Sequence, residues 1–462
     1  MQTRRGKVAN AKKLIAPIFR VCESDRMQES RGKGSMNWEE NNTMKKTKID
    51  EKDKKKLIER LKSEGKINKP DPSTLHGVPL WGWYVGAVIA SLLIALTLTF
   101  YVVPSKIQAV SFRLPDPIPL TGVLKENNRL TDAELLLENQ IFGPECIAVD
   151  KQKGFAYTAL KTGYICEIDI KQNPAKIIRS VRLNKLEECD GTYSSMPKCG
   201  RPLALRFAET GELFVLDAYS GLYMLNFAAE KVSHLLLGGA EITNDETAAP
   251  IRYLNDFDFL PDGRIVISEA SNKFDDRDHL YELFEHRPNG RLLVFDPKKE
   301  ELKVLLNDLY FPNGIQVIKG KVYFSELGMA RIIKYSPSSG KSEVVIDALP
   351  GYPDNIRLAS DGNLWVPLPA RRSTKDHYIE EHPALREFMT KIFSPTMFYW
   401  VTEWFTDTRG LVLKIDPESG KLLDSLHDPT GRISGITTAI EDGKGYLLLG
   451  ADTNYYLGRV KI

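Results

Sequence analysis

The chain has 462 residues, of which 42% are apolar, and this is enough for one large folded domain or two of ordinary size. Its formal net charge is only +2, because a Lys- and Arg-rich segment at the N-terminus is offset by a slightly acidic remainder. A nucleic-acid-binding protein would carry its basic surface on the folded part, so this distribution argues against nucleic acid as a partner. Five cysteines are too few for a disulfide-rich scaffold.

The first segment, residues 1–79, is a basic arm that we expect to lie in the cytosol and to be mostly disordered, because it combines many charges with few aromatic residues. A short charged helix is predicted within residues 50–65. Cys22 lies in this arm and is expected to be reduced. The Asn41-Asn42-Thr43 sequence is expected to remain unglycosylated there, and no further N-x-S/T sequence follows residue 104.

Residues 80–103 contain no charged side chain and are flanked by aromatic residues at both ends. About 20 apolar residues suffice to cross the hydrocarbon core, so this run predicts one transmembrane helix rather than a buried core helix. It begins too far from Met1 for an ordinary cleaved signal peptide, which favours an uncleaved signal anchor. Because residues 45–66 are dense in Lys, the positive-inside rule predicts a single-pass type II protein. Its remainder would then lie in the lumen or outside the cell, at the plasma membrane or an endomembrane.

Residues 104–462 repeat one pattern six times. A strand-start motif leads into an apolar run, a Gly turn and two further strands, with a weaker fourth strand after most of them. The motifs begin at Gly143, Gly200, Leu254, Pro312, Pro353 and Ser434. Six four-stranded repeats predict an all-β, six-bladed propeller, whereas a tandem pair of sandwiches would not explain six matched motifs. The last repeat stops at its third strand, so we expect residues 107–124 to supply the closing fourth strand.

The four cysteines beyond the arm fall into two pairs. Cys189 and Cys199 bracket a short polar loop that a local disulfide can close in an oxidising compartment. Cys146 and Cys166 lie in apolar, strand-like runs, which is typical of buried free thiols.

The strand-start motifs also carry a set of polar side chains that the propeller would bring to one end of its central channel. Two carboxylates and three amides belong to it, namely Glu145, Asn255, Asn313, Asp354 and Asn355. Such oxygen ligands suit Ca²⁺, and the lack of His or Cys argues against zinc or copper. Alternatively, Asn and Asp stand here because turns at strand starts favour them.

Several of these strings, among them GPECIAVD, CGRPLALRF, FPNGIQV, GYPDNIRLASDG and LHDPTGRI, resemble the strictosidine-synthase-like propeller family. The resemblance covers nearly everything after about residue 75. The wider superfamily includes paraoxonases and diisopropyl-fluorophosphatases, which are Ca²⁺-dependent hydrolases. The resemblance implies that the five residues above hold a catalytic calcium ion, and that Asp354 is the nucleophile or base.

The chain also departs from that superfamily pattern. Leu203 stands where paraoxonases carry a histidine, and the companion histidine position falls on Asp217 or Ala218. Cys146 replaces an acidic ligand of a second, structural calcium, of which Asp256 alone remains. Thr438 lies near the position of the catalytic Glu of strictosidine synthase, so that condensation reaction is not expected.

An insertion at about residues 370–405 interrupts the fifth repeat, with apolar residues at helical spacing. They are Leu385, Phe388, Met389, Ile392 and Phe393. The insertion can be a lid over the channel, a surface that touches the membrane, or a helix packed on the propeller. Phe388, Arg201 and Asp217 are candidate substrate-pocket residues, although an ion pair of Arg201 with Asp217 is an alternative. His377 and His382 could also reach a substrate, and the acidic residues near Asp276 are expected to be solvated.

Two functions remain open from the sequence. The first is a membrane-anchored, Ca²⁺-dependent hydrolase, arylesterase- or lactonase-like, that acts on a small-molecule ester or lactone. The second is a non-catalytic binding or scaffold protein whose propeller keeps calcium for stability.

Overall fold

The computed structural model describes residues 50–64, 74–75, 78–184, 186, 188–227, 229, 231–245 and 248–462. The predictions for residues 1–49, including Cys22 and the Asn41 sequence, lie outside these residues. The chain divides into two compact units, Met1–Gly86 and Ala87–Ile462, and each is described by itself.

The first unit holds the predicted charged helix, α1, at Glu51–Ser63. Its start is capped by the side chain of Asp50, and acidic residues in the first turn and basic residues in the last turn complement the helix dipole. A two-residue hairpin of β1 (Thr74–Leu75) and β2 (Val78–Pro79) precedes α2.

Helix α2, Leu80–Val102, crosses from the first unit into the second. It has 23 residues, an 18-residue stretch with a mean hydropathy of 2.3 and no buried side chain. Among the described residues it is the one helix that is long and apolar enough to cross a membrane.

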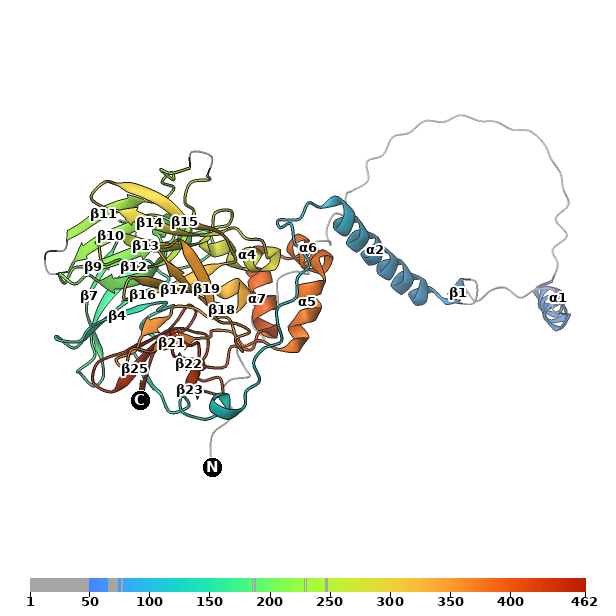
Figure 1. The fold of residues 1–462 in the computed structure, drawn as a ribbon. Helices are drawn as coiled ribbons and strands as arrows, with labels where there is room; N and C mark the ends of the chain where they lie inside the picture. The colour runs from blue at the N-terminus through green and yellow to red at the C-terminus, as the bar shows by residue number, and fades with distance from the viewer. Residues whose placement is uncertain are drawn as a thin grey trace, which may run out of the picture. The chain divides into compact units, whose positions relative to one another are not determined.

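The second unit is a six-bladed β-propeller, as predicted (Figure 1). Blades one and two consist of β4 (Ile147–Asp150), β5 (Phe155–Ala159), β6 (Tyr164–Asp169), β7 (Lys176–Arg182), β8 (Pro202–Phe207), β9 (Leu213–Asp217), β10 (Gly221–Asn226) and β11 (Lys231–Leu237). Blades three and four consist of β12 (Tyr253–Phe259), β13 (Ile265–Ser271), β14 (Gly290–Asp296), β15 (Glu301–Leu309), β16 (Pro312–Ile318), β17 (Lys321–Glu326), β18 (Arg331–Ser336) and β19 (Lys341–Ile346). Blades five and six consist of β20 (Arg357–Leu358), β21 (Leu364–Pro367), β22 (Leu411–Ile415), β23 (Leu422–His427), β24 (Ile436–Glu441), β25 (Tyr446–Ala451), β26 (Leu457–Lys461) and β3.

The closing strand comes from the N-terminal side of the propeller, but not from residues 107–124. It is β3, Glu134–Leu136, which pairs antiparallel with β26, and Arg459 and Glu134 form an ion pair of 2.6 Å across the pairing. The first part of residues 107–124 instead bonds to the helices at one end of the propeller. Val110 N donates to Glu285 O and Phe112 N donates to Glu380 O. Further along, Ile118 and Leu124 pack into the apolar cluster between blades four and five, and no residue of this range pairs with a strand of blade six.

The apolar core of the second unit lies between the blades. One buried cluster joins each neighbouring pair, from blades one and two round to blades six and one. The inner strands are therefore buried on both faces, and all seven residues of β13 are buried. Because every blade needs both neighbours to cover its faces, the ring is stable only when it is closed.

Helices α4 to α7 gather at one side of the propeller (Figure 1). With the short helices that precede them, they are η2 (Asp276–Asp278), α4 (His279–Glu285), η4 (Thr374–Asp376), α5 (His377–Glu381), α6 (Pro383–Ile392) and α7 (Pro395–Phe405). The last four form the helical insertion between β21 and β22. Ile107, Phe274, Tyr281 and Phe398 make a small core beneath them.

The cysteine predictions are confirmed where the structure describes them. Cys189 and Cys199 form a disulfide beside the short helix α3 (Met196–Cys199), and Cys146 and Cys166 are buried and free. Burial raises the pKa of both free thiols, so they remain protonated.

Candidate functional site

A cavity of about 220 Å³ opens at the end of the propeller where the innermost strands begin. Its wall contains Glu145, Asn255, Asn313 and Asp354, which come from four different blades. Asn355 lies behind them, and its side-chain amide donates to Glu145 Oε1 at 3.3 Å. The structure therefore brings the five oxygen-bearing residues of the strand-start motifs to one place.

Local backbone irregularities aim these side chains into the channel. The register of β12 with β13 shifts between Leu254 and Phe257, and that of β16 with β17 shifts between Pro312 and Ile315. Asn255 and Asn313 lie inside these two irregular stretches, where a strand is free to redirect a side chain.

Gly314 allows the close approach of blades four and five that this geometry needs. A Cβ atom at this position would lie 2.4 Å from both Asp354 O and Ile356 N. Only glycine therefore fits after Asn313, which explains the Asn-Gly pair of the fourth motif.

Four oxygens of the site are buried and have no hydrogen-bond partner among the described residues. They are Glu145 Oε2, Asn313 Oδ1, Asp354 Oδ1 and Asn355 Oδ1. A buried polar atom without a partner costs about 1–3 kcal/mol, so such a cluster favours a further partner, which a bound ion or water can supply. Carboxylate and amide oxygens are the donors that a hard cation such as Ca²⁺ takes, so the residues present fit that ion.

The two carboxyl groups of this set both have a raised pKa, because each is buried and lies near other acidic groups. Burial, followed by the charge of Asp452, raises the pKa of Glu145 to about 8. Burial and the charge of Glu145 raise the pKa of Asp354 well above its usual range. Within the described ranges no group of three or more His, Cys, Asp and Glu side chains is placed to hold a metal. Any cation here would therefore depend on the amide oxygens as well as on the two carboxylates.

A charge network with the buried Arg201 at its centre lies behind Glu145. Arg201 is fully buried and pairs closely with Asp452, while its guanidinium lies 3.8 Å from Glu145 Oε2. Lys161 adds a second pair to Asp452 at 2.9 Å. Although burial opposes ionisation, these two cations lower the pKa of Asp452, which therefore stays charged.

Three of the expected pocket residues have other roles. The ion-pair partner of Arg201 is Asp452 rather than Asp217, whose carboxylate accepts hydrogen bonds from the backbone N–H groups of Tyr219 and Ser220. Phe388 is not in the cavity wall, and its ring packs 5.7 Å from that of Phe100. Arg201 and Asp217 are likewise absent from the cavity wall.

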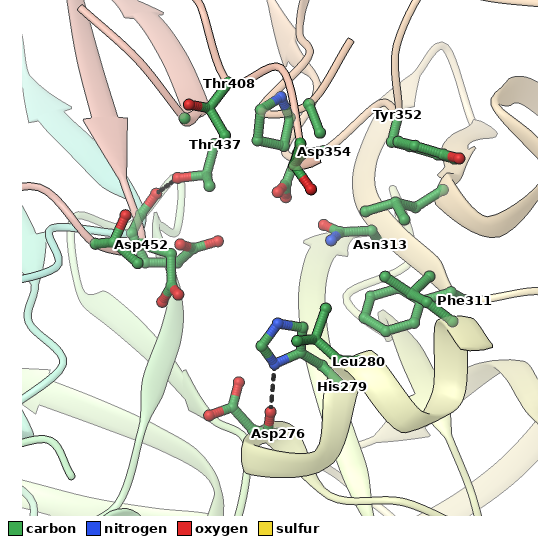
Figure 2. Close-up of a pocket in the computed structure, with 18 of the residues that line it drawn as sticks. Asp276, His279, Leu280, Phe311, Asn313, Tyr352, Asp354, Thr408, Thr437 and Asp452 are labelled. Carbon is green, nitrogen blue, oxygen red and sulfur yellow. Dashed lines mark hydrogen bonds between the residues drawn. The ribbon is translucent and has the colours of Figure 1, made fainter. Parts of the chain in front are cut away.

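The wall opposite Asn313 and Asp354 holds residues that the motifs did not indicate. His279 lies at the start of α4, and its Nδ1 atom is 3.0 Å from the backbone oxygen of Asp276. Because a carbonyl oxygen only accepts, Nδ1 carries the proton, and Nε2 of the neutral ring is left as an acceptor. Figure 2 shows the His279 ring facing the same space as Asn313 and Asp354.

Asp276 is buried, contrary to the expectation that its loop is solvated, and it accepts a hydrogen bond from Tyr253 OH at 3.1 Å. The two histidines singled out from the sequence lie elsewhere. His377 bonds to Glu380 and Asp116, and His382 bonds to Tyr378 O. The strand-start motifs indicate neither His279 nor Asp276, because both lie between β13 and β14, outside the repeated pattern.

Apolar side chains and the helical insertion also contribute to the cavity wall. Leu203, Leu280 and Phe311 line it, together with Tyr399 and Thr402 of α7.

Asp256, at the position of a structural calcium ligand in the superfamily that the sequence resembles, is neutralised by protein side chains. Arg357 lies 2.7 Å and Arg206 lies 3.2 Å from its Oδ2 atom. Burial opposes ionisation, but these two cations lower the pKa of Asp256. Two guanidinium groups therefore supply the positive charge that a second cation would bring.

Comparison with known proteins identifies relatives over most of the chain. Residues 255–365 match the strictosidine synthase family, and residues 122–168 match the N-terminal part of the strictosidine synthase-like family. Adipocyte plasma membrane-associated protein of Bos taurus is 35% identical over 77% of this chain and 84% of its own length. Strictosidine synthase-like 3 of Arabidopsis thaliana is 30% identical over 73% of this chain and 87% of its own length. A solved gluconolactonase of Xanthomonas campestris shares 15% identity over 78% of this chain and 99% of that chain, with a TM-score of 0.46.

Proposed function

The chain belongs to the family of the adipocyte plasma membrane-associated and strictosidine synthase-like proteins, and we propose that this member is a membrane-anchored, Ca²⁺-dependent hydrolase of esters or lactones. The observation that carries the proposal is the group of four buried oxygens without a hydrogen-bond partner, in or directly behind the wall of a cavity of about 220 Å³. Glu145, Asn255, Asn313, Asp354 and Asn355 would hold the ion.

The bound ion would supply positive charge that polarises the carbonyl oxygen of the substrate. The apolar side chains Leu203, Leu280 and Phe311 would orient an acyl or aryl group beside it, and α7 would limit the access of bulk water. The ion pairs of Arg201 and Lys161 with Asp452 would hold Glu145 in place from behind.

His279 is suited to move the proton in this reaction. Its Nδ1–H group is held by Asp276 O, so that Nε2 faces the cavity as an acceptor. A water oxygen would form the new bond to the carbonyl carbon while His279 Nε2 takes its proton. The acyl C–O bond would then break, and the proton would pass to the leaving oxygen. Asp354, which the resemblance suggested as nucleophile or base, would act mainly as a ligand, since its free Oδ1 belongs to the unpaired set.

We also propose the type II orientation, with the N-terminus in the cytosol. The disulfide between Cys189 and Cys199 supports it, because such bonds persist in the secretory route and outside the cell.

The test measures hydrolysis of phenyl acetate by the full chain in phospholipid nanodiscs, with Ca²⁺, after chelation and after Ca²⁺ is restored. Asp354→Ala and Asn313→Ala are compared with Asp132→Ala, an exposed aspartate outside the cavity wall. We expect activity to need Ca²⁺ and to fall about 100-fold or more in the two cavity variants, since each removes a ligand of the ion that stabilises developing charge.

Thermal unfolding separates the other outcomes. No hydrolysis, together with a melting temperature that falls on chelation, would favour a binding or scaffold protein with a structural ion. Indifference of both activity and melting temperature to chelation would exclude the cation site itself.

A further inference from the structure

Helix α7 has two faces of different character. Tyr399, Thr402 and Glu403 line the cavity. The other face carries large apolar side chains that are among the most exposed in the second unit: Met397 (53%), Trp400 (59%), Trp404 (81%) and Phe405 (86%). Positions 397, 400 and 404 follow helical spacing, so three of these residues form one stripe along the helix. An exposed cluster of this size marks a surface that something else covers.

The composition of this stripe fits a lipid surface. The only charged side chain of α7 is Glu403, which lines the cavity. No charged group of the exposed face therefore has to leave water when this face enters the membrane interface. Tryptophan is the residue that is enriched where a membrane meets water, because its ring is apolar and its N–H group finds a polar partner there.

Contacts with the end of α2 place the helical insertion beside the predicted membrane span. Within the unit Ala87–Ile462, the Phe100 ring lies 5.7 Å from that of Phe388 of α6. Lys391 Nζ donates to Phe100 O at 2.6 Å, and Ser105 Oγ lies 3.1 Å from Thr390 Oγ1. The end of α2, the predicted membrane span, therefore contacts α6. Helix α7 follows α6 after only two residues.

We propose that α7 lies in the lipid headgroup region, with Trp400, Trp404 and Phe405 inserted into it. The cavity behind α7 then opens at the membrane surface. Together with the proposed function, on which it rests, this placement of α7 assigns the substrate class. The substrate would be an ester or lactone with a long apolar group, which is dissolved in the bilayer and enters the cavity past α7. Two other occupants could cover the same stripe, a second copy of the chain or a different protein, and the test distinguishes them from lipid.

The first arm of the test needs no catalytic activity. The full chain is reconstituted in phosphatidylcholine vesicles that contain a photoactivatable phospholipid with its reactive group near the headgroup, and labelled peptides are identified after illumination. We expect labelling of residues 395–405 well above that of peptides with Leu237 and Val344, which are exposed on the outer strands β11 and β19. Labelling confined to α2, with residues 395–405 at the level of those controls, would overturn the proposal. Cross-links from α7 to a second copy instead of lipid would overturn it as well.

The second arm uses the double variant Trp400→Ser/Trp404→Ser, with Leu237→Ser as the matched control for loss of an exposed apolar side chain. Hydrolysis of water-soluble phenyl acetate is compared with hydrolysis of a long-chain aryl ester embedded in the vesicles. We expect at least about a tenfold loss for the embedded ester and little change for the soluble one, because the two tryptophans do not line the cavity.

If the double variant hydrolyses both esters as fast as the native chain, or loses the same factor on both, the proposal is overturned. Only contact of α7 with lipid would affect the two substrates differently. If the native chain hydrolyses neither ester, the proposed function fails, while the labelling arm still decides whether α7 touches the membrane.

Discussion

Because Glu145 is buried at the propeller channel, binding of a cation there would be coupled to release of the proton from its carboxyl group. Its pKa is raised to about 8, first by burial and then by the charge of Asp452, whereas Arg201 acts in the opposite direction. A cation needs the charged form of this carboxyl group, so below about pH 8 it must displace a proton. The charge balance of the site therefore depends on pH within the physiological range.

We expect the Ca²⁺ affinity of the full chain to weaken as pH falls below about 8, by about tenfold per pH unit for one displaced proton. Isothermal titration between pH 6 and 9 in buffers of different ionisation enthalpy would measure both the affinity and the proton released. Binding that is equally tight across this range, with no proton release, would contradict the assignment of Glu145 as a ligand.

His279 carries a second prediction at this scale. His279→Gln keeps a polar side chain but cannot accept a proton, so we expect kcat for phenyl acetate to fall about 100-fold or more. The Ca²⁺ affinity should stay close to that of the native chain, because His279 is not one of the proposed ligands. A hydrolysis rate that is retained, or an affinity that collapses with it, would show that His279 does not act as the base. His382→Gln, at an exposed histidine outside the cavity wall, is the matched control.

At the scale of elements, β3 decides whether the ring closes. It contributes three residues to blade six, and Leu136 is buried in the cluster that joins blades six and one. The ion pair between Glu134 and Arg459 lies nearer the surface, where such a pair contributes little. Burial of Leu136, rather than the surface charges, therefore holds the two ends of the propeller together.

Leu136→Ala should lower the free energy of unfolding by about 3 kcal/mol, as expected for truncation of a buried leucine. Glu134→Gln should cost less than about 1 kcal/mol. Urea unfolding of the full chain in detergent, followed by tryptophan fluorescence, measures both, with Leu237→Ala as the control at an exposed leucine. Equal costs for Leu136→Ala and Leu237→Ala would mean that β3 is dispensable for closure.

At the scale of the whole molecule, the propeller follows an apolar helix, α2, and the orientation that we propose for it rests on the charges before this helix. Pro337→Asn creates an N-x-S sequence with Ser339 in the turn between β18 and β19, where Ser338 and Ser339 are exposed. In mammalian cells we expect this variant to gain one glycan, because the positive-inside rule places the propeller in the lumen or outside.

Sensitivity of the added mass to an N-glycosidase measures this gain. The native chain, whose Asn41-Asn42-Thr43 sequence would face the cytosol, is the control and should carry none. A glycan on the native chain, with none added by Pro337→Asn, would reverse the orientation.

The sequence by itself determined the six-bladed ring, the apolar span and the oxygen-bearing residues of the strand-start motifs. Each of these is a local pattern, repeated along the chain or contained in one run, so neighbouring residues carry all the information. Asn313 and Asp354, for example, stand at equivalent points of two repeats, and the symmetry of a propeller brings such points to one channel.

Only the tertiary structure decided the closing strand, the partner of Arg201 and the histidine of the cavity. β3 and His279 lie outside the repeated pattern, and Asp452 directly follows the second strand of the sixth repeat. Their neighbours are remote in the chain: Asp452 meets Lys161 and Arg201 across 291 and 251 residues. Such contacts form when the ring closes and each loop settles against whatever charge or apolar surface the next blade presents. Their selection depends on burial and charge in three dimensions, which no spacing along the chain encodes.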